Sequence, residues 1–279
     1  MSKMITKQFS VVMSVYEGDN PDYFFQALDS ITRKQSVKPD EIVIVVDGPI
    51  SNEHEKVIEF FKNDFNLVIK RNEKNQGLGL ALKEGVLLAK NELIARMDSD
   101  DIAVSNRFEQ QLNFYNSYPD VDVLGGDISE FIDNEKNIVS IRRVMTHTNE
   151  IVKDLKKRCP INHVTVMMKK SSLINSGNYI ELHYNEDYFL WIRMVLKKCK
   201  FMNTGTVLVN VRSGPNQYAR RGGYKYFKSE QFLQKFMLKN RIISIPRYIV
   251  NILKRFIFQC LIPGSLRAFL YMKVIRSKK

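Results

Sequence analysis

The chain has 279 residues, of which 44% are apolar and 26% charged, with a formal net charge of +13 and three cysteines. This length and apolar content predict one α/β domain with a full core and an appendage. We expect no signal peptide, because the first eight residues are polar, and the cysteines lack disulfide or metal spacing, which favours a reducing cytoplasm.

Four apolar runs alternate with helical patterns in the first hundred residues. The runs are Phe9–Val15, Glu41–Val46, 65–69 and Leu93–Met97. The helical patterns that follow the first three runs are 23–31, 53–61 and 82–89. Strands that alternate with helices predict a mostly parallel sheet with helices on both faces, in which ligands bind outside the carboxyl ends of the strands.

Polar side chains stand near the end of each of these runs. They are Tyr16, Glu17, Asp47, Arg71 and the segment 98–101. Because the carboxyl ends of parallel strands meet at one edge of a sheet, we expect these side chains to share one rim.

Asp98, Asp100 and Asp101 place three carboxylates within four residues. Like charges at this spacing repel one another, and a bound Mg²⁺ or Mn²⁺ would neutralise them, since both ions prefer carboxylate oxygen. The alternative is a turn that caps a helix starting at Asn106, because Asp is favoured in turns and N-caps. The segment alone fits both interpretations equally. The shared rim favours the metal site, whose ion would hold a phosphate.

Gly77 and Gly79 do not form a dinucleotide-binding fingerprint. Leu82 occupies the position of the third glycine, and the segment follows the third apolar run instead of the first. The chain also has no Walker-type loop. These glycines are more simply explained by a sharp turn into the helix.

The middle of the chain predicts mixed strands around a helix. The expected strands are 121–124, 128–132 and 164–168, and the helix is near 149–157. Further on, Glu186 and Asp187 precede an apolar helical pattern. Asp187 is therefore either a rigidly held general base or a first-turn acid favoured by the helix dipole, and we favour the base.

Positive charge is confined to the last quarter of the chain. Residues 1–212 contain 28 Lys or Arg and 29 Asp or Glu, whereas residues 213–279 contain 15 Lys or Arg and one acid, Glu230. This tail is also apolar, but its longest uncharged run is too short to span a bilayer. It predicts helices that lie on an anionic membrane surface, or helices that pack on the domain with a solvated basic face.

In their order and spacing, these motifs resemble those of family 2 glycosyltransferases. The matching segments are Val15-Tyr16-Glu17, Val46-Asp47-Gly48, Asn75-Gln76-Gly77-Leu78, Asp98-Ser99-Asp100-Asp101 and Glu186-Asp187. The resemblance covers roughly residues 8–213, and residues 220–227 resemble a subset that builds bacterial O-antigens, capsules and exopolysaccharides. It implies a GT-A type fold, that is, an α/β fold with a mostly parallel nucleotide-binding sheet flanked by helices. The basic amphipathic C-terminal helical tail would be attached to this fold.

The resemblance also implies roles for individual residues. Nucleotide-sugar contacts would come from Val15, Tyr16, Glu17, Asp47, Arg71, Gly77, Asp98, Ser99, Arg220 and Arg221. Asp100, with Asp98, would ligate Mn²⁺ or Mg²⁺, and Asp187, with Glu186, would provide the general base. The family often has a histidine at the place of His163, near the acceptor, and a structural histidine with satisfied hydrogen bonds explains it equally well. Trp191 is explained by a core position or by stacking on an acceptor sugar, and Arg193 by a carboxylate partner or an acceptor contact.

The resulting hypothesis is an inverting, metal-dependent glycosyltransferase that moves a hexose from a UDP-sugar to an undecaprenyl-diphosphate-linked sugar. Residues 1–223 would form the catalytic domain, with a nucleotide-sugar half (1–120) and an acceptor half (121–223). Residues 224–279 would associate with the membrane, peripherally, at the cytoplasmic face of the bacterial inner membrane. The alternatives are a nucleic-acid-binding protein, which the acidic rim disfavours, and a catalytically inert nucleotide-sugar-binding protein.

Overall fold

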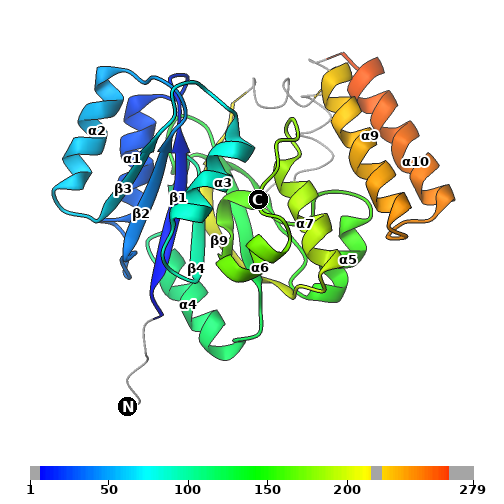
Figure 1. The fold of residues 1–279 in the computed structure, drawn as a ribbon, viewed down its shortest axis with the longest axis horizontal. Coiled ribbons are helices and arrows are strands. Elements are labelled where there is room, and N and C mark those ends of the chain that lie inside the picture. The colour runs from blue at the N-terminus through cyan, green and yellow to red at the C-terminus, as the bar shows by residue number, and fades with distance from the viewer. Residues whose placement is uncertain (1–6, 215–221, 264–279) are drawn as a thin grey trace.

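The computed structural model describes residues 7–214 and 222–263 (Figure 1). Four parallel strands form one half of its sheet, in the order β3-β2-β1-β4. They are β1 (Phe9–Val15), β2 (Glu41–Val46), β3 (Leu67–Arg71) and β4 (Leu93–Met97). Three of these strands have the predicted bounds, and β3 is displaced by two residues from the expected 65–69. Val46 pairs with both Val15 and Arg71, so the carboxyl ends of three strands are level.

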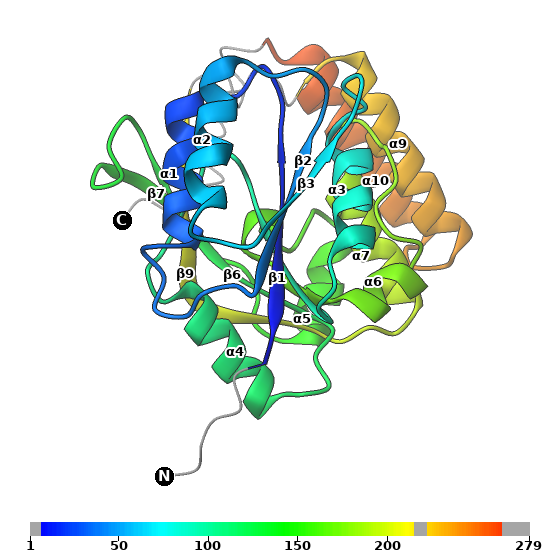
Figure 2. The same cartoon turned by 60° about the vertical axis from the view of Figure 1, so that its left-hand side comes forward.

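Helices cover both faces of this parallel half (Figure 2). Two of them, α1 (Pro21–Ile31) and α2 (Asn52–Lys62), lie on one face, and α3 (Leu78–Leu88) lies on the other. Successive side chains of β1 point to opposite faces of the sheet, so the strand contributes to a hydrophobic core on each face. Val11 and Met13 belong to one core, and Val12 belongs to the other. A Cβ at Gly85 would be 2.5 Å from Val12 Cγ1, so the absence of a side chain lets α3 approach the sheet.

The second half of the sheet is mixed. It contains β5 (Ile102–Ala103), β6 (Val123–Phe131), β7 (Ile138–Arg142), β8 (Met167–Lys169) and β9 (Phe201–Arg212). β8 joins β4 to β6 in antiparallel pairings, and β9 runs parallel to β6. Over the described residues, nine strands form one sheet. The predicted α/β fold is confirmed, with the parallel character strongest in the half formed by β1 to β4.

One strand, β6, replaces the two strands expected at 121–124 and 128–132. In the sequence, Gly125 and Gly126 suggest that one strand ends and another begins. In the structure the strand continues through both glycines, and its pairing with β9 shifts in register there. A Cβ at Gly126 would lie 2.6 Å from Leu208 Cδ1, and one at Gly125 would lie 2.4 Å from Asn203 Oδ1. The two glycines therefore allow close approach of β9, instead of ending the strand.

Four helices surround the mixed half of the sheet. They are α4 (Arg107–Ser117), α5 (Thr148–Leu155), α6 (Lys170–Asn175) and α7 (Glu186–Leu196). A 3₁₀ turn, His163–Thr165, precedes β8, where the sequence predicted strand from residue 164. The helix predicted near 149–157 corresponds to α5.

Two further helices, α9 (Tyr224–Lys239) and α10 (Ile245–Phe256), lie side by side beyond α7, and α10 continues into a π-helical turn, Ile257–Leu261 (Figure 1). Leu233 and Met237 of α9 belong to the same core cluster as Trp191 of α7. Asn185 Nδ2 donates to Ser229 Oγ at 2.7 Å. α9 therefore packs into the core from beyond the boundary expected at residue 223, as the alternative interpretation of the tail predicts.

The outer face of α10 is apolar and exposed. Ile245, Ile249 and Leu253, one turn apart, are 64%, 49% and 55% exposed, and Ile257 continues the row at 51%. We call these four residues the apolar stripe. No helix within residues 7–214 or 222–263 combines the length and apolarity needed to cross a membrane.

Candidate active site

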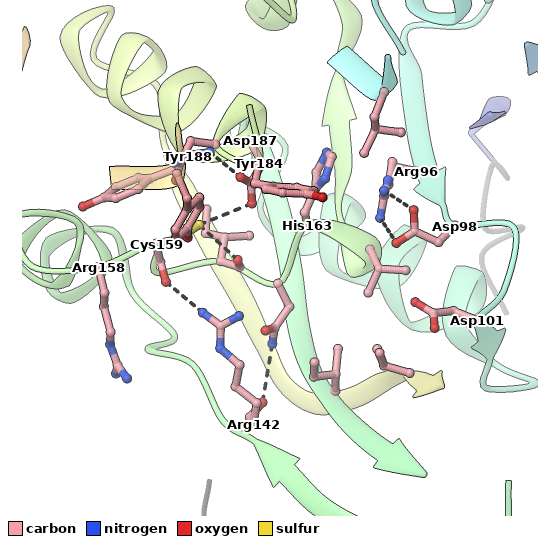
Figure 3. Close-up of a pocket in the computed structure, with 18 of the residues that line it drawn as sticks. Arg96, Asp98, Asp101, Arg142, Arg158, Cys159, His163, Tyr184, Asp187 and Tyr188 are labelled. Atoms are coloured by element: carbon pink, nitrogen blue, oxygen red, sulfur yellow. Dashed lines mark hydrogen bonds and ion pairs between the residues drawn. The ribbon is translucent and has the colours of Figure 1, made fainter. Parts of the chain in front are cut away.

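A cavity of about 1120 Å³ opens beyond the carboxyl ends of β1, β2 and β4. The parallel half contributes Tyr16, Asp47 and Asp98 to its lining, and the opposite wall contributes Asp187 and Lys254. Figure 3 shows Arg96, Asp98 and Asp101 on one side of the cavity, well separated from Arg142 and Arg158 on the other. Tyr16, Asp47 and the segment 98–101 of the predicted rim therefore form one wall of a cavity whose other wall comes from α7, α10 and the segment after α5.

Asp47 organises the loop that leads from β3 into α3. Its buried carboxylate accepts hydrogen bonds from the backbone N–H groups of Gln76 and Gly77, both at 2.9 Å, and from Asn72 Nδ2 at 3.1 Å. Gly77 has a φ of +92°, which favours glycine and allows the turn into α3. Asp47 thus positions Gly77 in the cavity wall, and both residues line the cavity.

Asp19 is a cavity residue that the sequence analysis missed. Its Oδ2 accepts hydrogen bonds from Ser99 Oγ at 2.7 Å and from the backbone N–H of Tyr16 at 3.2 Å. Burial raises the pKa of Asp19. The bonds tie the loop after β1 to the loop after β4, so Ser99 holds the cavity wall together. The only sequence signal was a third polar position close behind the first strand.

The three carboxylates of Asp98, Asp100 and Asp101 lie together, with one oxygen of each within 4.8 Å of the others. Burial, together with the charges of Asp98 and Asp19, raises the pKa of Asp100 to about 6. Burial and the charge of Asp100 raise the pKa of Asp101 well above its usual value. Crowded oxygen ligands with unrelieved repulsion fit a hard divalent cation such as Mg²⁺ or Mn²⁺.

The three aspartates differ in their protein partners. Asp98 forms a two-pronged ion pair with Arg96, whose Nη1 is 2.6 Å from Asp98 Oδ2. Asp101 is buried and accepts a hydrogen bond from the backbone N–H of Arg212 at 2.9 Å. These contacts hold the carboxylates of Asp98 and Asp101 in place. The carboxylate of Asp100 is therefore the one whose charge a bound ion would stabilise most.

Asp187 faces the same cavity from the first turn of α7. Its Oδ1 accepts a hydrogen bond from the backbone N–H of Tyr188 at 2.6 Å, and its Oδ2 accepts one from Cys159 Sγ at 3.4 Å. Burial raises the pKa of Asp187. Asn185 occupies the N-cap position of α7 but its side chain makes no capping hydrogen bond, so the hydrogen bond from Tyr188 gives Asp187 a role at the start of the helix besides its place in the cavity.

Glu186, expected beside Asp187 in catalysis, does not line the cavity. Its side chain packs against α3, where a Cβ at Gly79 would be 2.9 Å from Glu186 Cγ. Burial, with the charge of Asp187, raises the pKa of Glu186 to about 7. The catalytic expectation for Glu186 is corrected accordingly, since neighbouring side chains at a helix start point in different directions.

Two expected acceptor contacts belong to the protein interior. Trp191 is 0% exposed and its ring packs edge-on against Phe201. Arg193 donates to the backbone carbonyls of Ser176 at 2.7 Å and Asn178 at 2.6 Å. Neither residue lines the cavity. The core interpretation of Trp191 is therefore confirmed, and Arg193 pairs with backbone carbonyls instead of with a carboxylate or an acceptor.

His163 does line the cavity. Its Nε2 lies 2.8 Å from Tyr179 Oη. Burial, with the charge of Arg96, lowers the pKa of His163 well below its usual value, which keeps the imidazole neutral. His163 therefore enters the cavity as a neutral imidazole.

Three expected nucleotide contacts lie outside the lining of the cavity: Val15, Glu17 and Arg71. Val15 is buried and Glu17 is exposed. Arg71 pairs with Glu55 of α2 through both of its Nη atoms, at 2.6 and 2.8 Å. Arg220 and Arg221 lie outside the described residues.

Comparison with known proteins agrees with this geometry. Residues 10–177 match the family described as glycosyl transferase family 2. The chain belongs to this family. It is 38% identical over 271 residues to the UDP-Gal:alpha-D-GlcNAc-diphosphoundecaprenol beta-1,3-galactosyltransferase of Escherichia coli, covering 97% of this chain and 98% of the relative.

Two further comparisons extend the likeness. The amylovoran biosynthesis glycosyltransferase AmsE of Erwinia amylovora is 35% identical over 95% of this chain and 98% of its own length. The crystal structure of S. aureus TarS 1-349 in complex with UDP-GlcNAc superposes with a TM-score of 0.66 at 18% identity, over 96% of this chain and 76% of that one. The protein is therefore a glycosyltransferase with a GT-A type fold.

The family motifs do not include the basic wall opposite the aspartates. Five cations line the cavity there: Arg142, Lys157, Arg158, Lys254 and Arg255. Their scattered positions explain why the sequence analysis missed them, since no local pattern joins residues 142, 157 and 254. The basic composition of the tail was the only signal.

Proposed function

We propose that this glycosyltransferase transfers a hexose, with inversion, from a UDP-sugar to a sugar linked to undecaprenyl diphosphate, in the synthesis of a bacterial surface polysaccharide. The observation that carries the proposal is the single cavity that exposes both the aspartate cluster and Asp187. A glycosyl transfer needs a group that stabilises the charge on the leaving nucleoside diphosphate and a base for the attacking hydroxyl. The aspartate cluster, through its metal ion, would supply the first, and Asp187 would supply the second.

The relatives support the substrate classes. The E. coli relative is named for UDP-galactose and for an acceptor in which GlcNAc is joined to diphosphoundecaprenol. AmsE is named for the synthesis of a polysaccharide, amylovoran. Identity of 35% or more over nearly the full length of both proteins makes the same classes of donor and acceptor the best candidates here.

The parallel half of the sheet would bind the donor. Tyr16 and the loop held by Asp47 would contact the uridine, with Ser99 fixing the adjacent loop through Asp19. Asp100 and Asp98 would hold Mn²⁺ or Mg²⁺, which when bound supplies Lewis-acid stabilisation of the charge on the leaving diphosphate. Arg96 keeps Asp98 oriented by its two-pronged ion pair.

Asp187 would accept the proton of the attacking acceptor hydroxyl. The raised pKa that burial gives to Asp187 makes the carboxylate a stronger base than an exposed one. A single base opposite the leaving group gives one in-line displacement, and therefore inversion at the anomeric carbon. The hydrogen bonds from Tyr188 and Cys159 hold the carboxylate in place while the acceptor binds.

The apolar stripe of α10 would place the enzyme on the cytoplasmic face of the inner membrane as a peripheral protein. Exposed aliphatic side chains in one row favour partition into a lipid interface, and nearby Lys and Arg residues favour anionic headgroups. This location would bring the cavity to a lipid-linked acceptor.

The decisive experiment offers the purified protein a panel of nucleotide sugars with a synthetic GlcNAc-diphosphate-lipid acceptor, in Mn²⁺, in Mg²⁺ and in EDTA. We expect transfer from a UDP-hexose that depends on the metal, and a product with the inverted anomeric configuration. Full activity in EDTA or a retained configuration would contradict the mechanism. Absence of transfer to any diphosphate-linked sugar would contradict the acceptor class.

A further inference from the structure

The cations of the cavity wall form a continuous feature that the proposed mechanism does not use. We call Arg142, Lys157, Arg158, Lys254 and Arg255 the basic rim. They come from the end of β7, from the segment after α5 and from the last turn of α10. Figure 3 shows Arg142 and Arg158 on the side of the cavity away from Asp98 and Asp101.

Direct contacts hold the two main segments of the basic rim together. Arg255 Nη2 donates to the backbone carbonyl of Lys157 at 3.1 Å, while its Nε donates to Glu230 Oε2 at 2.5 Å. Asn251 Nδ2 of α10 donates to the carbonyl of Lys156 at 2.9 Å. The backbone that carries Lys157 and Arg158 is thus fixed to α10, so the rim is built in advance of ligand binding.

Two ammonium groups of the basic rim are available to a ligand. Lys157 and Lys254 are exposed, and neither forms an ion pair with any residue that the structure describes. Arg158 is paired with Asp154 but is 53% exposed at its side chain. Arg158 and Arg255 are paired with Asp154 and Glu230, so the two lysines contribute most of the direct attraction for an anion. The aspartate wall, in contrast, can hold a phosphate only through a metal ion.

The basic rim is also close to the proposed base. Arg142 Nη2 donates to the backbone carbonyl of Cys159 at 2.8 Å, and Cys159 Sγ donates to Asp187 Oδ2 at 3.4 Å. Arg158 directly precedes Cys159 in the chain. One residue therefore connects Asp187 to the rim through two hydrogen bonds.

The chemistry of the acceptor is consistent with a cationic wall next to the proposed base. If Asp187 takes a proton from a hydroxyl of the acceptor sugar, the diphosphate on the anomeric carbon of that sugar lies one hexose ring away. The donor diphosphate belongs to the aspartate wall, so a second diphosphate needs a different, metal-free site. Only the basic rim offers one among the described residues that line the cavity.

The lipid has a path out of the cavity beside the rim. Ile257 and Phe258 line the cavity next to Lys254 and Arg255. Ile257 is also part of the apolar stripe, so apolar surface continues from the cavity to the outer face of α10. A lipid diphosphate needs cations for its phosphate groups and, next to them, apolar surface for its hydrocarbon chain, and the basic rim and the apolar stripe offer both.

We propose that the basic rim binds the diphosphate of the lipid-linked acceptor directly, without a metal ion, and thereby selects acceptors that carry this group. The proposal rests on the proposed function, because it assigns the acceptor end of the same cavity. An anionic phospholipid headgroup has similar chemistry and is the other source of phosphate that the experiment must distinguish.

The test uses Lys157→Gln, Arg158→Gln and Lys254→Gln in the full-length protein. Arg247→Gln is the matched control, because Arg247 is an exposed cation of α10 that does not line the cavity. Two soluble short-chain acceptors are compared without vesicles: a GlcNAc diphosphate alkyl ester and the uncharged alkyl glycoside of GlcNAc. UDP binding and slow hydrolysis of the UDP-sugar report on the donor half.

We expect each rim variant to raise the KM for the diphosphate acceptor about tenfold or more, the effect of one lost charge-assisted contact. The KM for the uncharged acceptor, UDP binding and donor hydrolysis should not change, and Arg247→Gln should resemble the unmodified protein. Farnesyl diphosphate should bind in EDTA and lose affinity in the same variants. This binding assay does not require sugar transfer, so it measures diphosphate binding by the basic rim even if the proposed acceptor sugar is wrong.

Equal losses with both acceptors, or no loss with either, would overturn the proposal while leaving the proposed function in place. A change confined to binding of anionic vesicles would assign the rim to phospholipid headgroups and also overturn it. If the unmodified protein transferred no sugar to the diphosphate acceptor and did not bind farnesyl diphosphate in EDTA, both proposals would fail.

Discussion

The thiol of Cys159 donates a hydrogen bond to the carboxylate of Asp187, with 3.4 Å between Sγ and Oδ2. Burial raises the pKa of Asp187, and this hydrogen bond acts in the opposite direction because it stabilises the charged carboxylate. Burial, with the charge of Asp187, also raises the pKa of the Cys159 thiol well above its usual value, so the thiol keeps its proton. Cys159 is therefore a positioning residue for the proposed base.

We predict that Cys159→Ala moves the acidic limb of the kcat/KM profile to higher pH. Loss of the donor raises the pKa of Asp187 further, so the carboxylate ionises later as pH rises. One neutral hydrogen bond corresponds to a shift of about half to one pH unit. Cys159→Ser retains a hydrogen-bond donor, so the acidic limb of its kcat/KM profile should stay at the original pH. If Cys159→Ala lowered kcat/KM by the same factor at every pH, Cys159 would have a structural role only.

We predict that Asp187→Asn lowers kcat by about 10² to 10⁴, because an amide cannot accept the hydroxyl proton. Binding of UDP and Mn²⁺ should be retained, because Asp187 lies on the wall opposite the aspartate cluster. The amide oxygen of Asn can still accept the hydrogen bond from the backbone N–H of Tyr188, so the unfolding temperature should change little. Glu186→Gln is the control, because Glu186 neighbours Asp187 without lining the cavity. Normal turnover of Asp187→Asn, or an equal loss in Glu186→Gln, would refute this assignment of the base.

We predict that Asp100→Asn abolishes the Mn²⁺-dependent part of UDP binding, measured by calorimetry. The folded protein holds the pKa of Asp100 at about 6, above its ordinary 3.8, so metal-free stability falls as pH rises between these values. At pH 7, Asp100→Asn should therefore raise the unfolding temperature in EDTA and remove the stabilisation by Mn²⁺. Asp120→Asn, at an exposed ion pair with Lys200, is the control. An unchanged response to Mn²⁺ would exclude Asp100 as a ligand.

We predict that Ile249→Ser combined with Leu253→Ser weakens binding to anionic vesicles about tenfold. Both side chains are exposed, so UDP binding and the unfolding temperature should not change. Leu87→Ser is the matched control, because Leu87 is as exposed as Leu253 but lies on α3. Substitution is a cleaner test than deletion of α10, which would leave the buried Glu230 without Arg255. Unchanged vesicle binding of the double variant would argue against the stripe as the membrane contact.

The sequence predicted the parallel half of the fold because local and tertiary preferences agree there. β1, β2 and β4 are apolar runs buried on both faces, and their bounds follow from composition alone. Elsewhere the local signal misled. Gly125 and Gly126 look like a strand break, and only the close approach of β9 explains why the strand continues.

The site divides in the same way. The cluster Asp98 to Asp101 and the acid Asp187 were visible as short motifs at element ends, where a parallel sheet and a helix start bring them to one cavity. The separation of Asp187 from Glu186, and the burial of Trp191, depend on the rotation of α7 against α3 and β9. Rotation of a helix is set by packing with distant elements, so adjacent letters in the sequence do not reveal it.

By itself, the sequence determined the fold class, the family, the aspartate cluster and the basic, apolar character of the tail. Only the tertiary structure decided that α9 completes the core, that Arg142, Arg158 and Lys254 share one wall, and that this wall adjoins Asp187. The physical reason is the separation along the chain of the residues that interact. Motifs and periodicity record interactions between near neighbours in the chain, whereas packing of α10 on the segment after α5 joins residues that are 95 and 98 positions apart.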